Sequence, residues 1–179
     1  NFNYPDEIWN HAYNYQIKPD DQLLLSTLFS FSNAPTIDEL ETAFMSRVNH
    51  EINTNNKTKE INAFKKSINR IDGGLIITKK DNVDFVNPSL KDYLIKFLKE
   101  DRDEMDRIVN SIVYITQFSE QLFETVNYTP NLSEDLKTKL VEDYNSFVRP
   151  SYHDYDSDLI QLAIILKKHI NTRECDSVI

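Results

Sequence analysis

Residues 84–94 read DFVNPSLKDYL, and this stretch decides how the middle of the chain folds. Apolar and polar side chains alternate over residues 83–85, which is typical of a strand with one buried face. Asn87 and Pro88 follow at once, and these residue types are preferred at the N-cap and the first position of a helix. The stretch therefore predicts that a strand ends in a capped turn and that a helix begins directly behind it.

The segments on both sides of this turn have clear patterns. The predicted helix carries apolar residues at the spacing i, i+3, i+4, i+7 and i+8, at Leu90, Tyr93, Leu94, Phe97 and Leu98. Before the turn, residues 75–80 and 83–87 predict two strands joined by a short turn. The adjacent Gly73 and Gly74 are expected to end the helix that precedes this hairpin.

Four helices are predicted upstream of the hairpin. The first covers residues 4–17, and a leucine-rich one with Leu23 to Phe29 is expected to be central to the core. Thr36 and Glu39 form a capping-box pattern that opens the next, which should end before the polar, Asn-rich residues 49–58. The fourth has apolar side chains at helical spacing, at Ile61, Phe64, Ile68 and Ile71.

This order of elements indicates a mainly α protein. Three helices followed by a two-stranded wing predict a winged helix-turn-helix, here with one helix before it and one after it. After residue 100 the pattern is helical only, over residues 103–117, 118–127, 133–149 and 157–170, which predicts an antiparallel helical array. We expect two units, a winged-helix domain with an N-terminal helix over residues 1–100 and a helical domain over residues 101–179.

Composition limits the classes of partner. The formal net charge of −9 opposes binding to nucleic acid and to anionic membranes, and the longest apolar run is too short to span a bilayer. Residues 50–80 carry seven basic and three acidic side chains, whereas residues 101–179 carry eight basic and fifteen acidic ones, which supports a division near residue 100. A single cysteine fits a reducing cytoplasm. Because the chain begins with Asn and shows no leader, we expect a piece of a longer cytoplasmic protein.

The sequence lacks the patterns of the common catalytic and metal sites. Its two glycines are adjacent, so a glycine-rich phosphate loop cannot be built. The four histidines share no zinc-ligand spacing, and DYDSD at 154–158 lacks the glycine and distal glutamate of a calcium loop. Nor is there a GxSxG nucleophile elbow. We therefore expect no catalysis, no cofactor and no metal in this chain.

A DNA-binding transcription regulator is the alternative interpretation. Lys65, Lys66 and Arg70 lie on the helix that reads DNA in DNA-binding winged helices, and Lys79 and Lys80 lie at the tip of the predicted wing. Against this, an acidic side chain interrupts the basic face and only one arginine is present to recognise guanine. A solvated lysine face explains the same residues, and a plain helical interaction domain is a third possibility.

Two segments carry a family resemblance. EIWNHAYNYQI at 7–17 and FVNPSLKDYLIKFL at 85–98 resemble the winged-helix segment of STAND-class P-loop NTPases, the signalling ATPases that include NACHT proteins and novel STAND families. Many members carry Phe-x-His-x-Ser after the wing, then an apolar residue, any residue, an acid, Tyr or Phe, and an apolar residue. This chain matches that pattern at Phe85, Ser89, Leu90, Asp92, Tyr93 and Leu94. The resemblance covers roughly residues 4–128.

The resemblance implies a non-catalytic regulatory and interaction module. The winged helix would pack on an N-terminal nucleotide-binding module that lies outside this chain, so ATP or ADP is implied for the parent protein only. In resting family members the motif histidine contacts the phosphates of ADP, and Asn87 stands at that position. An amide can donate a hydrogen bond but carries no charge, so its phosphate contact would be weaker. The helices after residue 100 would contact sensor or effector proteins.

Overall fold

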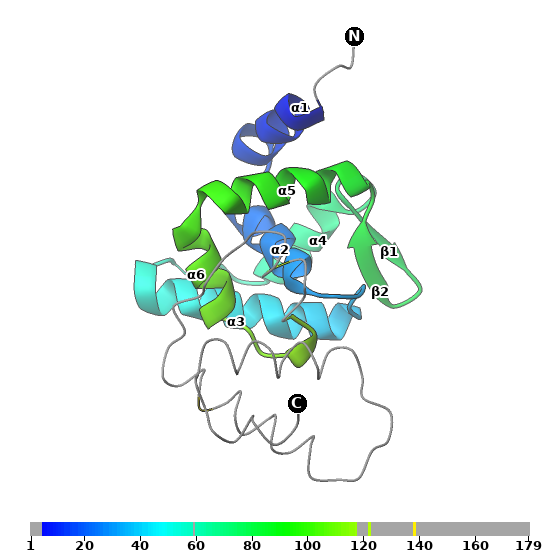
Figure 1. Cartoon of the computed structure of the whole chain (residues 1–179). Coiled ribbons are helices and arrows are strands. Elements are labelled where there is room, and N and C mark those ends of the chain that lie inside the picture. Colours follow the sequence, from blue (N-terminus) through cyan, green and yellow to red (C-terminus); the bar gives the residue numbers. More distant parts are fainter. Residues whose placement is uncertain (1–4, 59, 118–121, 123–137, 139–179) are drawn as a thin grey trace, which may run out of the picture.

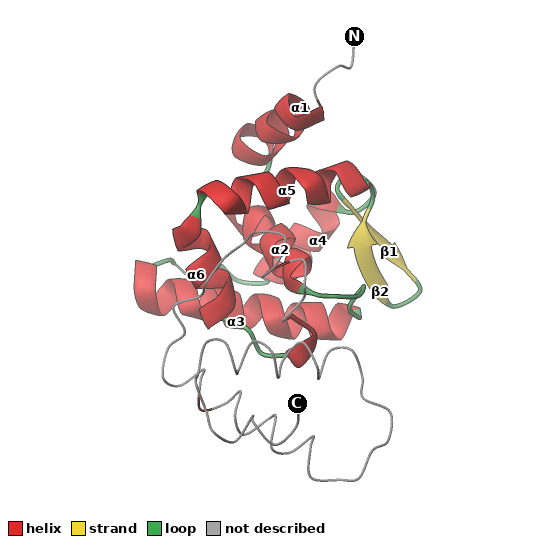
Figure 2. Cartoon of the chain, in the orientation of Figure 1, coloured by secondary structure: helices red, strands yellow, loops and turns green. Residues whose placement is uncertain are grey.

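The computed structural model describes residues 5–58, 60–117, 122 and 138. The elements in chain order are α1 (Pro5–His11), the π-helical turn η1 (Ala12–Gln16), α2 (Pro19–Ser30), α3 (Ile37–Asn55), α4 (Ala63–Ile71), β1 (Ile76–Lys79), β2 (Asn82–Phe85), α5 (Pro88–Glu100), α6 (Arg102–Asn110) and the 3₁₀ turn η2 (Ile115–Gln117). The described part is thus mainly helical with one two-stranded antiparallel sheet, as predicted (Figure 2).

The leucine-rich helix α2 is the centre of the core. Leu24, Leu25 and Phe29 are exposed by 1% or less, and α3, α4, α5 and α6 all pack against this helix (Figure 1). Pro19 stands at its start and two aspartates occupy its first turn, where the helix dipole favours negative charge. The central position predicted for this helix is confirmed.

The hairpin is tied to the helices by a linker. In the antiparallel pair, Lys79 lies opposite Asn82, so that Lys80 and Asp81 form a two-residue loop. The linker between α2 and α3 bridges to β2 at Thr36, and the Val83 N–H donates to the Pro35 carbonyl oxygen at 2.9 Å. Thr36 and Glu39 form the predicted capping box at the start of α3. One residue therefore both caps a helix and anchors the hairpin.

The end predicted for the helix after Thr36 is wrong. The Asn-rich residues predicted as a loop continue α3 to Asn55. Their polar side chains bond back along the helix. Thr54 Oγ1 donates to the His50 carbonyl oxygen at 2.7 Å, and Asn55 Nδ2 donates to Glu51 Oε2 at 2.7 Å. The buried Glu51 lies inside this stretch, so tertiary packing extends the helix beyond the point where composition favours a loop.

Three further boundaries differ from the prediction. Helix α4 begins only at Ala63, behind an Asn62 in the left-handed region, and Ile61 is left 79% exposed outside it. Helix α6, predicted over residues 103–117, begins at Arg102 behind the N-cap Asp101 and ends at Asn110. The separate turn η2 follows, where the Gln117 side chain accepts the backbone N–H groups of Val113 and Tyr114.

The hydrophobic core continues across residue 100. Leu98 on α5 and Met105 and Ile108 on α6 belong to one cluster of buried side chains, and α6 packs on both α3 and α5. The helices predicted over 118–127, 133–149 and 157–170, with the DYDSD stretch, lie outside the described residues except for Leu122 and Thr138. The division into two domains at residue 100 stays a prediction. Within the described part of the chain, no helix has the length and hydrophobicity needed to cross a membrane.

Candidate functional site

The turn at Asn87 joins the hairpin to α5 as predicted. Asn87 has an extended backbone (φ −132°, ψ 125°), and its Oδ1 accepts the backbone N–H of Ser89 at 3.0 Å. The Ser89 hydroxyl donates to the same oxygen at 2.9 Å. Pro88 occupies the first helical position. Asn87 is therefore the N-cap of α5, and this part of the prediction is confirmed.

In the first turn of α5, the Asn87 side chain is the main hydrogen-bond donor that an anion could reach. Pro88 has no N–H, the Ser89 N–H is bound to Oδ1, and the Leu90 N–H donates to the Asn87 carbonyl oxygen at 3.0 Å. The other end of the exposed Asn87 side chain is its Nδ2 group, which has no hydrogen-bond partner among the residues that the structure describes. The two N–H bonds of that group are the donors that a phosphate oxygen could reach at this turn.

Helix α1 holds the turn from the other side. Trp9 Nε1 donates to Ser89 Oγ at 2.8 Å, and the Tyr93 hydroxyl donates to Asn10 Oδ1 at 3.3 Å. Behind them Tyr13 is 4% exposed, with its ring 5.0 Å from that of Phe97. Figure 1 shows α1 lying against the side of α5 that faces away from α3. Sequence reasoning missed this contact, because no local signal indicates that Trp9 has a polar partner 80 residues away.

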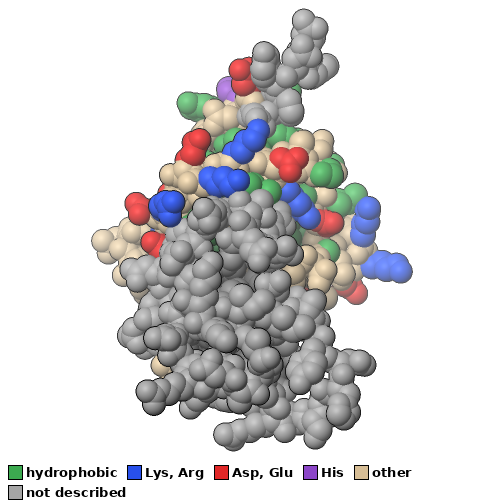
Figure 3. Space-filling view, in the orientation of Figure 1, with side chains coloured by type: hydrophobic (Ala, Val, Ile, Leu, Met, Phe, Trp, Pro, Cys, Tyr) green, Lys and Arg blue, Asp and Glu red, His purple; other side chains and the backbone are tan. Residues whose placement is uncertain are grey.

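The five basic candidates of the DNA-binding alternative have different surroundings. Arg70 is bound to the buried Asp21 of α2, with Nη2–Oδ1 at 2.6 Å and Nε–Oδ2 at 3.0 Å. Lys66 pairs with Glu60 at 2.6 Å. The remaining three are exposed on α4 and at the end of the hairpin, namely Lys65, Lys79 and Lys80. On the surface in view, Figure 3 shows basic and acidic side chains interspersed over the described residues. The one arginine of the predicted recognition helix is thus already bound to a carboxylate of α2.

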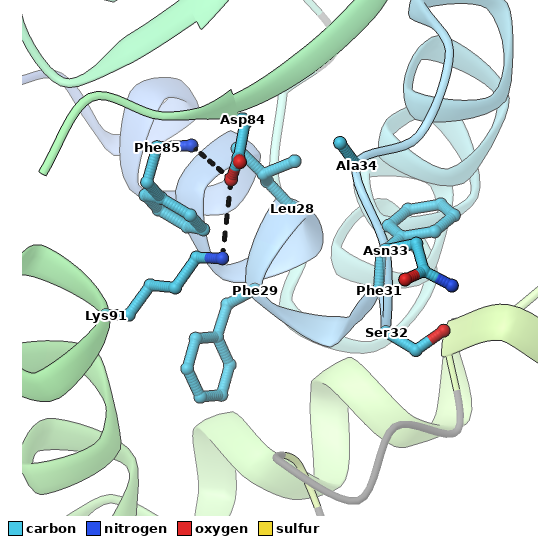
Figure 4. A pocket seen from close by; sticks show the side chains of 9 residues that line it. All are labelled: Leu28, Phe29, Phe31, Ser32, Asn33, Ala34, Asp84, Phe85 and Lys91. Carbon is cyan, nitrogen blue, oxygen red and sulfur yellow. Dashed lines mark hydrogen bonds and ion pairs between the residues drawn. The ribbon is translucent and has the colours of Figure 1, made fainter. Parts of the chain in front are cut away.

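A pocket of about 210 Å³ opens next to the turn, between the end of α2, the following linker and the start of α5 (Figure 4). One wall is the ion pair between Asp84 Oδ1 and Lys91 Nζ, 3.3 Å apart. The Lys91 ammonium lies 5.4 Å from the centroid of the Phe85 ring, in a cation–π arrangement. The two charges that line the pocket therefore neutralise each other. Lys91 is half-buried by these contacts, whereas the neighbouring Asp92 is exposed.

The most buried charged cluster joins α3 to α6. Arg47 is 1% exposed and donates to Glu51 and, at 2.8 Å, to Glu104 Oε2. Arg107 donates to Glu104 Oε2 at 3.0 Å through its Nε. The positive charges of two arginines thus compensate the negative charges of two glutamates between these helices. Sequence reasoning missed this cluster, because Arg47 and Glu104 lie 57 residues apart and each sits in a polar stretch.

Among the described residues, no group of three or more His, Cys, Asp or Glu side chains is arranged to hold a metal ion. No family model, no curated protein and no solved structure matches this chain. The functional interpretation therefore depends on the geometry of the Asn87 turn and on the motif around it.

Proposed function

We propose that this chain is the winged-helix and following helical region of a cytoplasmic, STAND-like signalling NTPase. In this proposal it is a regulatory and interaction module without catalysis of its own, and it packs on a nucleotide-binding module N-terminal to it. The order α2, α3, α4, β1, β2 supports a winged helix, as does the linker that ties β2 to the start of α3. The helical region after residue 100 would serve contacts with sensor or effector proteins.

The observation that carries the proposal is that the two ends of the Asn87 amide have different surroundings. Its Oδ1 accepts both hydrogen bonds that cap α5, whereas its Nδ2 lies at the exposed end of the amide. Capping the helix and donating to a phosphate are therefore compatible, because they use opposite ends of one group. Asn87 also stands at the position where the resembled family has its phosphate-contacting histidine.

The decisive experiment compares nucleotide retention in the full-length protein with Asn87, with Asn87→Asp and with Asn87→Ala. The aspartate keeps an oxygen for the cap, so its free energy of unfolding should stay within about 0.5 kcal/mol of the wild type. It replaces the NH₂ donor by a negatively charged oxygen, which repels phosphate. We expect ADP affinity to fall roughly ten- to a hundredfold, as for the loss of a hydrogen bond to a charged group. The alanine variant should lose both ADP and about 1 kcal/mol of stability.

Bound nucleotide is measured by acid release from the purified protein and chromatographic quantification. A full-length protein that never carries nucleotide would refute the proposal. Equal amounts of bound ADP in the wild type and in Asn87→Asp would show that Asn87 only caps its helix. The DNA-binding alternative has less support, because Arg70 and Lys66 are already paired. Tight binding to random duplex that weakens steeply with salt would favour that alternative.

A further inference from the structure

Three side chains from α1 and α5 form a hydrogen-bond chain with a fixed direction. An indole N–H can only donate, so Ser89 Oγ must accept from Trp9 Nε1, at 2.8 Å. The hydroxyl proton of Ser89 is then directed to Asn87 Oδ1, at 2.9 Å. The chain therefore starts on α1 and ends on the oxygen of the Asn87 amide.

This direction adds to the cap in favouring the orientation of the Asn87 amide whose NH₂ group faces outward. With Trp9 in place, the oxygen receives two donors, the N–H and the O–H of Ser89. A flipped amide would bring its NH₂ group, which is itself a donor, against both of them. The Ser89 hydroxyl oxygen has two lone pairs, and Trp9 occupies one of them. Accepting this bond polarises the hydroxyl, which makes it a stronger donor to Asn87 Oδ1 and a weaker acceptor for the NH₂ group of a flipped amide, so loss of Trp9 would lower the penalty on the flipped orientation. Trp9 thus acts on the orientation of Asn87 without touching it.

The other contacts of α1 with α5 lie further along the helix. The Tyr93 hydroxyl bonds to Asn10 Oδ1 at 3.3 Å, and the Tyr13 ring lies 5.7 Å from that of Tyr93. These contacts hold α1 against α5 but do not join the chain that ends on Asn87. Tyr93→Phe is therefore a matched control, because it removes a hydrogen bond between the same two helices and leaves the chain intact.

We propose that Trp9 and Ser89 are positioning residues that hold the Asn87 NH₂ group toward a nucleotide phosphate. The docking of α1 on α5 would then be coupled to nucleotide retention, so that a movement of α1 would weaken the hydrogen bond from the Asn87 NH₂ group to the phosphate. This inference rests on the proposed function, and it assigns a role to α1 that the cap alone does not need. Since Trp9 is the single tryptophan of the chain, the signal of its indole N–H reports directly on its contact with Ser89.

The hydrogen-bond chain is tested first without nucleotide. In the ¹⁵N-labelled 179-residue chain, the single indole N–H gives one NMR signal. Ser89→Ala removes its acceptor, so this signal should shift and its exchange with solvent should accelerate about two- to tenfold. Tyr93→Phe should leave the exchange rate unchanged. An indole signal that is insensitive to Ser89→Ala would overturn the inference.

The coupling is tested next by the rate of ADP release from the full-length protein. Trp9→Phe and Ser89→Ala should each accelerate release about two- to tenfold. The double variant should be no faster than Ser89→Ala alone, because Trp9 acts on Asn87 only through Ser89. Tyr93→Phe should release ADP at the wild-type rate.

The outcomes separate the two proposals. ADP retention with wild-type release rates in Trp9→Phe and Ser89→Ala overturns the positioning role and leaves the proposed function standing. Equal acceleration by Tyr93→Phe and Trp9→Phe also overturns it, since the effect would then come from general loosening of α1. Absence of nucleotide from every form refutes the proposed function, and the phosphate part of this inference with it.

Discussion

At the scale of single residues, Arg47 carries the largest energetic constraint. Its side chain is 1% exposed, and desolvating a guanidinium is costly unless carboxylates compensate. Glu51 and Glu104 supply that compensation from α3 and α6, although Arg47 Nε has no partner among the described residues. The arginine thus makes the contact between two helices depend on charge pairing as well as on apolar packing.

Replacing Arg47 by Met should lower the free energy of unfolding by about 3 kcal/mol, because it removes the more buried of the two arginines that compensate the carboxylates of Glu51 and Glu104. Urea unfolding followed by circular dichroism measures this change. Arg107→Met is the control, since the Arg107 side chain is 30% exposed and its removal should cost about 1 kcal/mol or less. Similar losses for both variants would show that Arg47 is not the central member of the cluster.

At the scale of elements, the hairpin contains a residue in an unfavourable backbone conformation. Lys80, the first residue of its two-residue loop, has φ +56°, in the left-handed region that residues with a Cβ rarely adopt. The linker bridge at Thr36 and the ladder between β1 and β2 hold the loop in this shape. The hairpin therefore tolerates local strain because its strands are anchored to the helices.

Lys80→Gly should raise the free energy of unfolding by about 0.5–1 kcal/mol, since glycine adopts a positive φ without steric cost. Asp81→Gly is the matched control at the next position, which has no positive φ. It should destabilise the protein by about 0.4–1 kcal/mol through the added entropy of the unfolded chain. Thermal and urea unfolding measure both effects. A Lys80→Gly protein that is less stable than wild type would contradict the strain.

At the scale of the whole molecule, the cluster between α3 and α6 makes stability depend on pH. Burial lowers the pKa of His50, and the charge of Arg47 lowers it further. Burial alone would raise the pKa of Glu51, but hydrogen bonds from Asn55 and Arg47 and the arginine charges outweigh it and lower that pKa. In both cases the unfolded chain binds protons more readily than the folded one, so stability rises with pH.

The urea midpoint should therefore be highest above the unfolded histidine pKa of 6.5 and should fall as the pH drops through the lower folded value. A second decrease should begin below the unfolded glutamate value of 4.5. His50→Gln should flatten the first decrease and leave the second one in place. A midpoint that stays constant between pH 7.5 and pH 5.5 would contradict this assignment.

The sequence by itself determined the features that depend on near neighbours. The capping box of Thr36 and Glu39 and the start of α5 at Pro88 follow from groups within four residues of each other. The hairpin follows from two strand patterns that are joined by a short turn. The buried positions of α5 also follow, because helical periodicity places apolar side chains on one face whatever they pack against. The burial of α2 on all sides from Leu24 to Ser30, with its serines and threonine, does not follow from a one-sided pattern. Most of the secondary structure and the capping role of Asn87 were therefore predictable.

Only the tertiary structure decided which polar groups meet. The end of α3 was predicted wrongly because Glu51 is held by a cluster that reaches Glu104 on α6. The partners of Arg70 and of Trp9 lie 49 and 80 residues away. The free energy of such a contact depends on how far folding removes both groups from water, and no local pattern contains that information. The contact of Trp9 with Ser89, on which the positioning role depends, belongs to this second kind of feature.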